Sequence, residues 1–467
     1  MKIVSKEQFK TGEEYFRSLI FLSPLILLFF ISLFQVFNLT VLQGDKFQTI
    51  AESNRIYQKP INPVRGFIYD RKGNLLAENI VQRDLYVTPA YILDSSETLL
   101  KLSNLLELPY ENLRDNYLKL VKKQKKFDSF PLVKALNEEQ VAKTKVNLDS
   151  ISGIEVKATL KRFSLYEENF AHILGYVGDV SSEEIQDDIK LADLQNLQIG
   201  KTGIEKKFDA ILRGKPGVQT QERDVKGKLV RVLDTEGAED GQNIYLSIDK
   251  ELQNHLFKFF KNKRGALVAL EPKTGLIRAL ISSPSFNPNI LNSIVDSGEV
   301  KTLFSDKESP LFNRALSGQY PPASTLKPFV GLAAIENQVI SWDKKIEDNG
   351  KYYVEGDPRP YRGWKENGHG LVDMRKAIAE SSDVYFYNLA YDLTLSGMRP
   401  MLENFGFGKK IGLMNIESSG LLPDKKWKLG YKGDFWFKGD TINLGIGQGY
   451  MLTTPLQLAL AYSGLAN

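Results

Sequence analysis

The sequence contains no cysteine among its 467 residues. This absence excludes disulfide bonds, thiolate zinc sites and a cysteine nucleophile. Histidine is also scarce, because the chain has three, at His172, His255 and His369. We therefore expect no histidine-rich metal centre and no cofactor, and a Ser-His-Asp triad would have to use one of these three residues.

Neither sign of charge dominates the chain. Lysine and arginine together number 61 and aspartate and glutamate 57, which leaves a net charge of +4. This small excess argues neither for nor against a polyanionic partner, and no basic block dominates the chain. No nucleic-acid partner is expected. The length predicts roughly two to four domains, each with its own core.

One long segment carries no charge, residues 18–43. A helix of this length rises on the order of 39 Å, enough to cross the ~30 Å core of a bilayer. A cleaved signal peptide is the alternative, but the run is too long and no A-x-A-like site follows it. We predict a transmembrane helix that anchors the chain by a single span. Basic residues slightly favour a cytoplasmic tail over residues 1–17.

The pattern changes at about Gln242. Residues 244–248 predict a strand, and Asp249 predicts the cap of a helix that begins at Lys250. Residues 265–270 and 276–281 are apolar strand candidates joined by turn-forming residues, which predicts an antiparallel hairpin.

The segment Tyr320–Pro328 carries the most informative motif, with Ser324 at a predicted helix N-terminus and Lys327 one turn further on. A serine hydroxyl is a weak nucleophile until a neighbouring base takes its proton, and a desolvated lysine can be neutral enough to do so. The four-residue pattern S-x-x-K also arises by chance, and the serine is then a helix cap beside a solvated lysine. The flanking sequence decides between the two readings.

With its flanking motifs the chain resembles the class B penicillin-binding proteins of the elongation type, which combine S-x-x-K with S-x-N or S-x-D. The second motif matches Ser381-Ser382-Asp383, for which an ordinary helix N-cap is the alternative. Further matching segments follow in the expected order, at Pro63–Gly66, Gly200–Glu205, Arg264–Ala266, Pro284–Asn289 and Gly445–Gly449.

The resemblance implies a multi-domain α+β protein. After the anchor it places an elongated, non-catalytic pedestal or dimerisation domain over residues 44–241. A transpeptidase domain, an antiparallel sheet covered by helices, follows over residues 242–467. It also implies a single-pass protein of the cell inner (cytoplasmic) membrane, with the bulk of the chain in the periplasm.

The same resemblance implies crosslinking of peptidoglycan stem peptides during cell elongation. Ser324 would attack the D-Ala-D-Ala bond, Lys327 would act as general base, Ser381 as proton shuttle and Asp383 as orienting group. β-Lactam antibiotics would acylate Ser324. Implied partners are a SEDS-type glycan polymerase and other elongation-complex proteins.

The family's third motif, K-T-G or K-S-G, is not found where it is expected. Three K-T-G triplets occur, but all precede Ser324, whereas the family's motif follows the S-x-D motif. We therefore expect a transpeptidase domain that is incomplete at its C-terminus. In the family, the strand that carries this third motif supplies one of the two backbone N–H donors of the oxyanion hole. The loss of one such donor lowers the rate about 10²–10³-fold. The fragment is expected to be inactive and poorly stable.

Some relatives hold zinc near the active site. Of the four corresponding positions Asp348 and His369 match, whereas Gly363 and Ser382 occupy the other two. Two ligands cannot close a tetrahedral site, so no metal is expected and His369 is predicted to hydrogen-bond within its loop. Ala323 stands where relatives often carry glycine, and we expect it to preserve helix entry.

Other functions use parts of the same pattern. A D,D-carboxypeptidase or β-lactamase would pass the acyl group to water, although the long pedestal and the single anchor argue against both. A non-catalytic β-lactam sensor is disfavoured by the single span. A membrane-anchored envelope scaffold or pseudoenzyme would not react with penicillin at all.

Overall fold

The structure is a computed structural model that describes residues 22, 24, 27–43, 55–122, 127–147, 150–187, 198–224, 229–291 and 298–467. The chain divides into two compact units. One unit comprises Met1–Pro63 and Lys215–Glu239, and the other comprises Val64–Gly214 and Asp240–Asn467. The predicted cytoplasmic tail, residues 1–17, and part of the predicted anchor lie outside the described residues.

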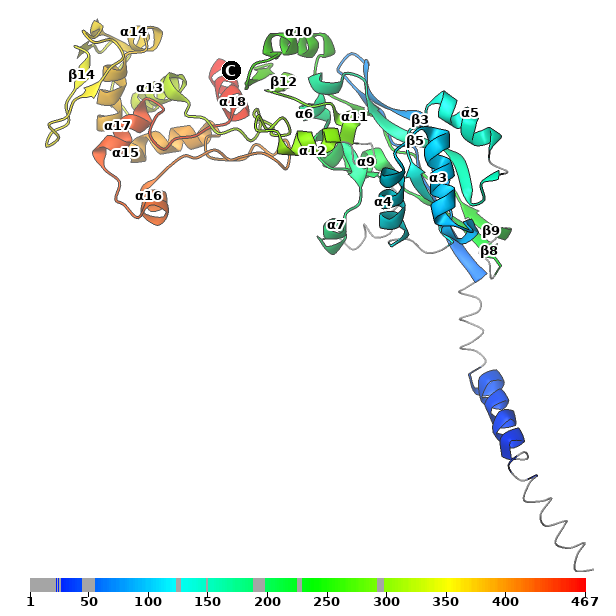
Figure 1. Ribbon diagram of the computed structural model, residues 1–467. Coiled ribbons are helices and arrows are strands. Elements are labelled where there is room, and N and C mark those ends of the chain that lie inside the picture. The colour runs from blue at the N-terminus through cyan, green and yellow to red at the C-terminus, as the bar shows by residue number, and fades with distance from the viewer. Residues whose placement is uncertain are drawn as a thin grey trace, which may run out of the picture. The chain divides into compact units, whose positions relative to one another are not determined.

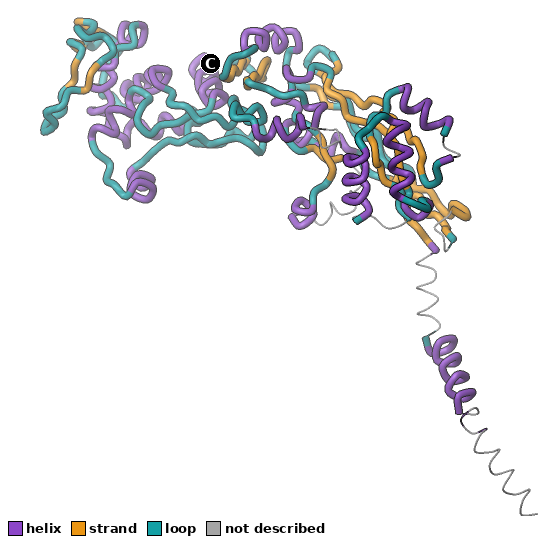
Figure 2. Tube along the Cα trace, in the orientation of Figure 1, coloured by secondary structure: helices purple, strands orange, loops and turns teal. Residues whose placement is uncertain are grey.

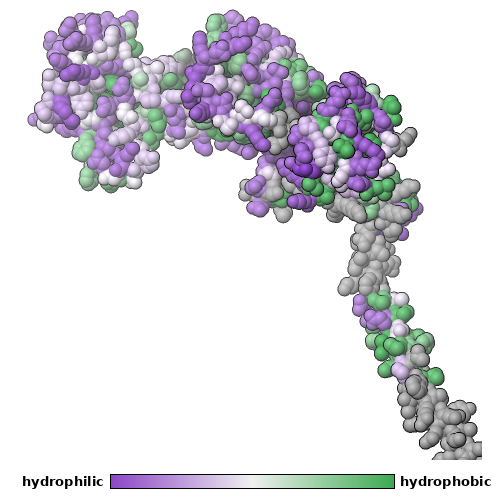
Figure 3. Space-filling model, in the orientation of Figure 1, coloured by the Kyte–Doolittle hydropathy of each residue, from purple (hydrophilic) through white to green (hydrophobic). Residues whose placement is uncertain are grey.

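The described part of the predicted anchor is helical. Residues 27–37 form a helix that ends in a π-helical turn, η1 (Asn38–Leu42). Its apolar side chains are exposed, as Leu27 at 62% and Phe34 at 65% illustrate, and Figure 3 shows this segment as mostly hydrophobic where it is coloured. Within the described residues, no helix combines the length and apolar character that a membrane span requires.

The first unit contains a three-stranded antiparallel sheet in the order β1-β8-β9. Its strands are β1 (Ile56–Ile61), β8 (Gly217–Arg223) and β9 (Leu229–Glu236). Every residue of β9 is exposed.

The second unit begins with a five-stranded sheet in which β10, β2, β3 and β4 follow one another and β5 pairs with β3. Its strands are β2 (Ile68–Tyr69), β3 (Leu75–Val87), β4 (Phe130–Val133), β5 (Ile154–Ser164) and β10 (Ile244–Tyr245). The predicted strand 244–248 is therefore shorter than expected, and it pairs parallel with β2.

Three helices pack beside this sheet, α3 (Ser95–Leu106), α4 (Tyr110–Val121) and α5 (Glu138–Val146) (Figure 1). Asp94 caps α3, because its carboxylate accepts hydrogen bonds from two backbone N–H groups of the first turn. Leu99, Leu102 and Leu106 follow the helical repeat and are buried in one core with residues of β3 and β4. Shorter elements of this region are η2 (Pro89–Tyr91), η4 (Glu167–Asn169), α6 (Ala171–Leu174), β6 (Val177–Asp179), α7 (Ser182–Asp187), β7 (Gln198–Gly200), α8 (Gly203–Lys207) and α9 (Asp209–Arg213).

The predicted hairpin is confirmed as β11 (Gly265–Leu270) and β12 (Ile277–Ser283), which pair antiparallel. The K-T-G triplet at Lys273 lies in the turn between these strands, where Gly275 has φ +70°. Asp249 caps α10 (Lys250–Phe260) as predicted. In the described part of the chain this sheet has two strands.

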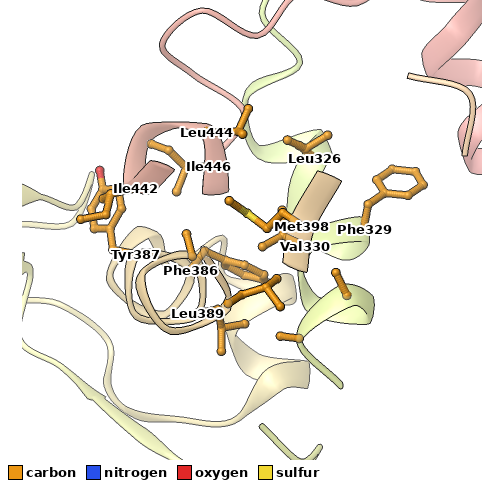
Figure 4. Packing of buried hydrophobic residues seen from close by; sticks show 14 of the residues in the cluster. Leu326, Phe329, Val330, Phe386, Tyr387, Leu389, Met398, Ile442, Leu444 and Ile446 are labelled. Carbon is orange, nitrogen blue, oxygen red and sulfur yellow. The ribbon is translucent and has the colours of Figure 1, made fainter. Parts of the chain in front are cut away.

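Helices and loops dominate the C-terminal half (Figure 2). Its core lies between α13 (Lys327–Glu336), α15 (Asp383–Asn404) and α17 (Lys438–Gly445). Figure 4 shows Val330 of α13 and Phe386 and Leu389 of α15 converging there. Further elements are α11 (Pro288–Leu291), α12 (Gly298–Ser305), η6 (Ala323–Leu326), β13 (Ile346–Asp348), β14 (Lys351–Tyr352), β15 (Tyr361–Arg362), β16 (Gly370–Val372), α14 (Met374–Ala379), α16 (Lys425–Lys432) and α18 (Pro455–Ala466).

Candidate active site

Ser324 is an exposed residue in the 3-10 turn η6, and the α-helix α13 begins three residues later at Lys327. The predicted helix N-terminus is therefore a tighter turn that leads into the helix. The turn is fixed from outside, because the N–H of Ala323 donates to the carbonyl of Gly447 at 2.8 Å. A Cβ on Gly447 would come within 2.2 Å of the Ala323 carbonyl oxygen, so this close approach requires glycine.

The backbone of Ala323 is left-handed, with φ +50°. This conformation costs a non-glycine residue about 1–2 kcal/mol. Alanine preserves the entry to the helix, as predicted, but it does so with backbone strain that glycine would not have.

Lys327 is buried, with 1% of the residue exposed. Its Nζ donates to the Ser381 carbonyl at 2.8 Å, to the Ser381 Oγ at 3.1 Å and to Asp383 Oδ1 at 2.7 Å. Burial lowers the pKa of the Lys327 amine below its ordinary value, while the Asp383 carboxylate opposes that shift. A lysine held in this way loses its proton more readily than one in water.

Ser381 joins the nucleophile to the lysine. Its hydroxyl donates to the Ser324 Oγ at 2.9 Å and accepts from the Lys327 Nζ. The three hydrogen bonds of the Lys327 amine go to Ser381 and Asp383, so its connection to Ser324 passes through Ser381. Ser381 also has a left-handed backbone, with φ +55°. Strain of this kind persists where the surrounding structure over-determines the backbone, often at functional sites.

Asp383 is the first residue of α15 and divides its carboxylate between two partners. Oδ1 accepts from Lys327, and Oδ2 accepts from the backbone N–H of Trp364 at 3.0 Å. The indole Nε1 of Trp364 donates to the Ser381 carbonyl at 3.1 Å. Trp364 thus holds both residues of the second motif. No sequence pattern points to Trp364, because it is an isolated aromatic residue in a loop without a repeating pattern.

Behind the second motif lies a buried polar cluster centred on Asp348. Its Oδ2 accepts from the Ser382 Oγ at 2.6 Å and contacts the His369 Nδ1 at 2.7 Å, and its Oδ1 accepts from the Gly350 N–H at 2.8 Å. Burial acts to raise the pKa of the Asp348 carboxyl, but these three contacts outweigh it and hold the pKa below its usual value. His369 thus hydrogen-bonds within this part of the fold, as predicted.

Ser382 also caps α15, because its hydroxyl accepts from the Tyr385 N–H at 3.2 Å. The N-cap that was the alternative reading for Ser381 and Asp383 is therefore Ser382, which stands between them. Among the residues that the structure describes, no three histidine, aspartate or glutamate side chains are grouped as a metal site would need.

We predict that Ser382→Ala lowers the free energy of unfolding by about 2–3 kcal/mol. The variant loses a helix cap, worth about 1 kcal/mol, and removes a hydrogen bond from a buried carboxylate. Urea unfolding followed by circular dichroism measures this loss. Ser341→Ala is the matched control, because Ser341 is exposed in the turn after α13. Equal stability of the two variants would contradict the bracing role of Ser382.

Comparisons with known proteins cover both halves of the chain. The Penicillin-binding Protein dimerisation domain family matches residues 60–246, and the Penicillin binding protein transpeptidase domain family matches residues 265–467. Peptidoglycan D,D-transpeptidase MrdA of Acinetobacter baumannii is 36% identical over 431 residues, which cover 92% of this chain and 64% of that protein. The Haemophilus influenzae protein of the same name is 37% identical over 97% of this chain and 70% of its own length.

Solved structures agree with the sequence matches. The penicillin-binding protein PBP2 of Helicobacter pylori, in complex with MreC, superposes with a TM-score of 0.77 at 30% identity, over 86% of this chain and 76% of that chain. Pseudomonas aeruginosa PBP2 in complex with WCK 5153 gives a TM-score of 0.65 at 30% identity, over 88% and 70% of the two chains. The chain thus spans about two thirds of the length of the curated relatives it matches.

Proposed function

The chain belongs to the penicillin-binding protein family, and we propose that it crosslinks peptidoglycan as a D,D-transpeptidase through the hydroxyl of Ser324. One observation carries this proposal. Ser324, Ser381, Lys327 and Asp383 form a continuous series of hydrogen bonds, although up to 57 positions of sequence separate the bonded partners. An ordinary helix cap beside a solvated lysine would not produce that connection.

The reaction has two acyl-transfer steps. Ser324 Oγ attacks the carbonyl of the penultimate D-Ala of a stem peptide, forms an ester and releases the terminal D-Ala as an amine. The amine of a second stem peptide then attacks the ester, forms the crosslinking amide and returns the hydroxyl to Ser324. A strained β-lactam amide presents the same carbonyl, so it would acylate Ser324 and leave no departing amine.

Protons move along the observed contacts. The Ser324 hydroxyl passes its proton to Ser381 Oγ, and Ser381 passes its own proton to a neutral Lys327 amine. The reverse transfer protonates the departing D-Ala nitrogen. Asp383 keeps the lysine directed at Ser381, and Trp364 keeps Asp383 in place. Ser381 is thus a relay for the nucleophile as well as for the amines.

The proposal includes a place in the cell. Residues 18–43 would anchor the protein in the inner membrane, with the bulk of the chain in the periplasm. The exposed apolar side chains of residues 27–37 support this, because apolar side chains around a helix favour a lipid environment. A SEDS-type glycan polymerase would supply the glycan strands during elongation. The H. pylori relative in complex with MreC supports an elongation-complex partner of that kind.

A crosslinking assay tests the activity. The protein expressed from its complete native gene would be incubated with lipid II and a glycan polymerase, and muropeptides would then be separated by mass. Crosslinked dimers with released D-Ala are expected. Release of D-Ala without dimers would assign a D,D-carboxypeptidase instead. If neither crosslinked dimers nor free D-Ala appear and the protein does not react with penicillin, the result would assign a membrane-anchored scaffold instead of an enzyme.

A further inference from the structure

The helix α16 carries aromatic rings that are stacked and partly open to solvent. Trp427 and Tyr431 stand four residues apart on one face, with ring centroids 5.5 Å apart and an interplanar angle of 17°. The ring of Tyr450 lies 5.3 Å from that of Trp427. We call these three rings, together with Lys432, the cationic–aromatic platform. Stacking fixes the rings as one surface rather than as separate mobile side chains.

The outer part of this platform is strongly exposed. Tyr431 is 73% exposed, and the nearby Phe435 and Phe437 are 71% and 57% exposed. Trp427 is half-buried and anchors the stack. Exposed aromatic rings beside an anchored one are typical of a binding surface, because rigid rings offer contact area at little cost in conformational entropy.

Lysine side chains without an ion-pair partner in the described part of the chain lie on and beside the platform. Lys425, Lys426 and Lys432 are exposed, and none of the three has a carboxylate within salt-bridge distance among the residues that the structure describes. The amine of Lys432 lies 5.3 Å from the Tyr431 ring centroid and 5.9 Å from that of Tyr450. Lys428, by contrast, is paired with two aspartates. A ligand that matches this surface is anionic and offers a flat or apolar face to the rings.

The platform is tied to the segment that carries the nucleophile. Tyr450 lies between two contact points, the Gly447 carbonyl that accepts from the Ala323 N–H, and Thr453, which exchanges two backbone hydrogen bonds with Tyr320. Their partners, Tyr320 and Ala323, both lie shortly before Ser324 in the sequence. The platform is therefore connected, through the segment that contains Tyr450, to the backbone that positions the reactive hydroxyl.

We propose that the cationic–aromatic platform binds the glycan strand of peptidoglycan, with sugar rings on Tyr431 and Tyr450 and carboxylates of the attached stem peptides on Lys432 and its neighbours. This inference rests on the proposed function and adds a binding site for the polymer to it. A lipid surface would also suit aromatic and lysine side chains. The connection of the Tyr450 segment to the nucleophile segment favours the polymer, since the strand carries the stem peptides that Ser324 would attack.

A binding experiment tests the platform apart from the chemistry. The complete native protein carrying Ser324→Ala, which forms no acyl-enzyme, is titrated with soluble uncrosslinked glycan strands that bear stem peptides. Tyr431→Ala in this background is expected to weaken strand binding about fivefold to tenfold through loss of ring contact. Tyr431→Phe keeps the ring and should retain most of the affinity. Lys432→Gln keeps all rings but removes one positive charge. It should lower the affinity for the strand and make that affinity less dependent on salt concentration.

Tyr245→Ala is the matched control, because Tyr245 is also an exposed tyrosine, at 67%, stacked on another ring, that of Tyr69. It should bind strands as the parent does. Equal affinity of Tyr431→Ala and Tyr245→Ala would overturn the proposal. Tyr431→Ala could instead weaken binding to vesicles of phosphatidylethanolamine and phosphatidylglycerol while its affinity for glycan strands is unchanged. That result would overturn the proposal in favour of a membrane surface. Unchanged thermal unfolding excludes misfolding as the cause, and the crosslinking assay reports on the proposed function separately.

Discussion

Replacing Ser324 with alanine is expected to abolish covalent labelling of the protein by a fluorescent penicillin. Without Oγ no ester can form at this position, so the yield of adduct should fall at least about 10³-fold. The fold should be unaffected, because Ser324 is exposed and surface substitutions usually change the free energy of unfolding by less than about 0.5 kcal/mol. The measurement is in-gel fluorescence of the protein expressed from its complete native gene.

Ser341→Ala serves as the control, since it removes the hydroxyl of another exposed serine that lies beyond the far end of α13. It should label like the parent protein. Mass spectrometry of the parent should place the penicilloyl group on the peptide that contains Ser324. An adduct of undiminished yield in Ser324→Ala would remove this residue from its role as nucleophile.

Replacing Lys327 with methionine is expected to reduce the rate of acylation by about 10²–10⁴-fold, the range that a general base contributes. Methionine fills most of the buried volume but can neither accept the proton from Ser381 nor donate to Asp383. The second-order rate constant for penicillin acylation, measured by stopped reactions under excess ligand, reports the loss. A rate within threefold of the parent would contradict the assignment.

The pH dependence of the same rate constant gives an independent test. Only the neutral amine can take a proton, and burial lowers the pKa of Lys327 from its ordinary value of 10.5. In the parent, the rate should rise with pH and level off once pH exceeds the pKa of the folded protein. In Lys327→Met this rise should disappear. Since the folded state binds this proton less readily than the unfolded state, the buried charge destabilises the fold at low pH, and that penalty is relieved as pH rises.

Lys201→Met is the matched control for Lys327→Met. Lys201 is a partly buried lysine whose Nζ is paired with Glu184 at 2.5 Å, within the region that matches the dimerisation family. The same substitution there also breaks a lysine–carboxylate pair, so it should lower stability. It should leave the acylation rate and its pH dependence unchanged. If both variants lose the rate equally, general instability explains the effect and the catalytic assignment of Lys327 fails.

Several elements could be predicted from the sequence because their signals are local. The β11–β12 hairpin follows from two apolar runs around Glu271–Gly275, and the start of α10 follows from the capping residue Asp249. The spacing of Ser324 and Lys327 predicts one helical turn between them. The strand expected over residues 244–248 was too long, because its extent depends on pairing with β2 rather than on its own residues.

The sequence by itself determined the family, the order of the two matched regions and the residue types of the candidate site, since each is carried by short contiguous motifs. Only the tertiary structure decided how those residues connect. Packing of α13 against α15 brings Ser381 between Ser324 and Lys327, places Trp364 on Asp383, and buries Asp348 behind Ser382. These contacts join positions far apart in the chain, and their geometry follows from the burial of side chains from several elements in one core, which no local pattern encodes.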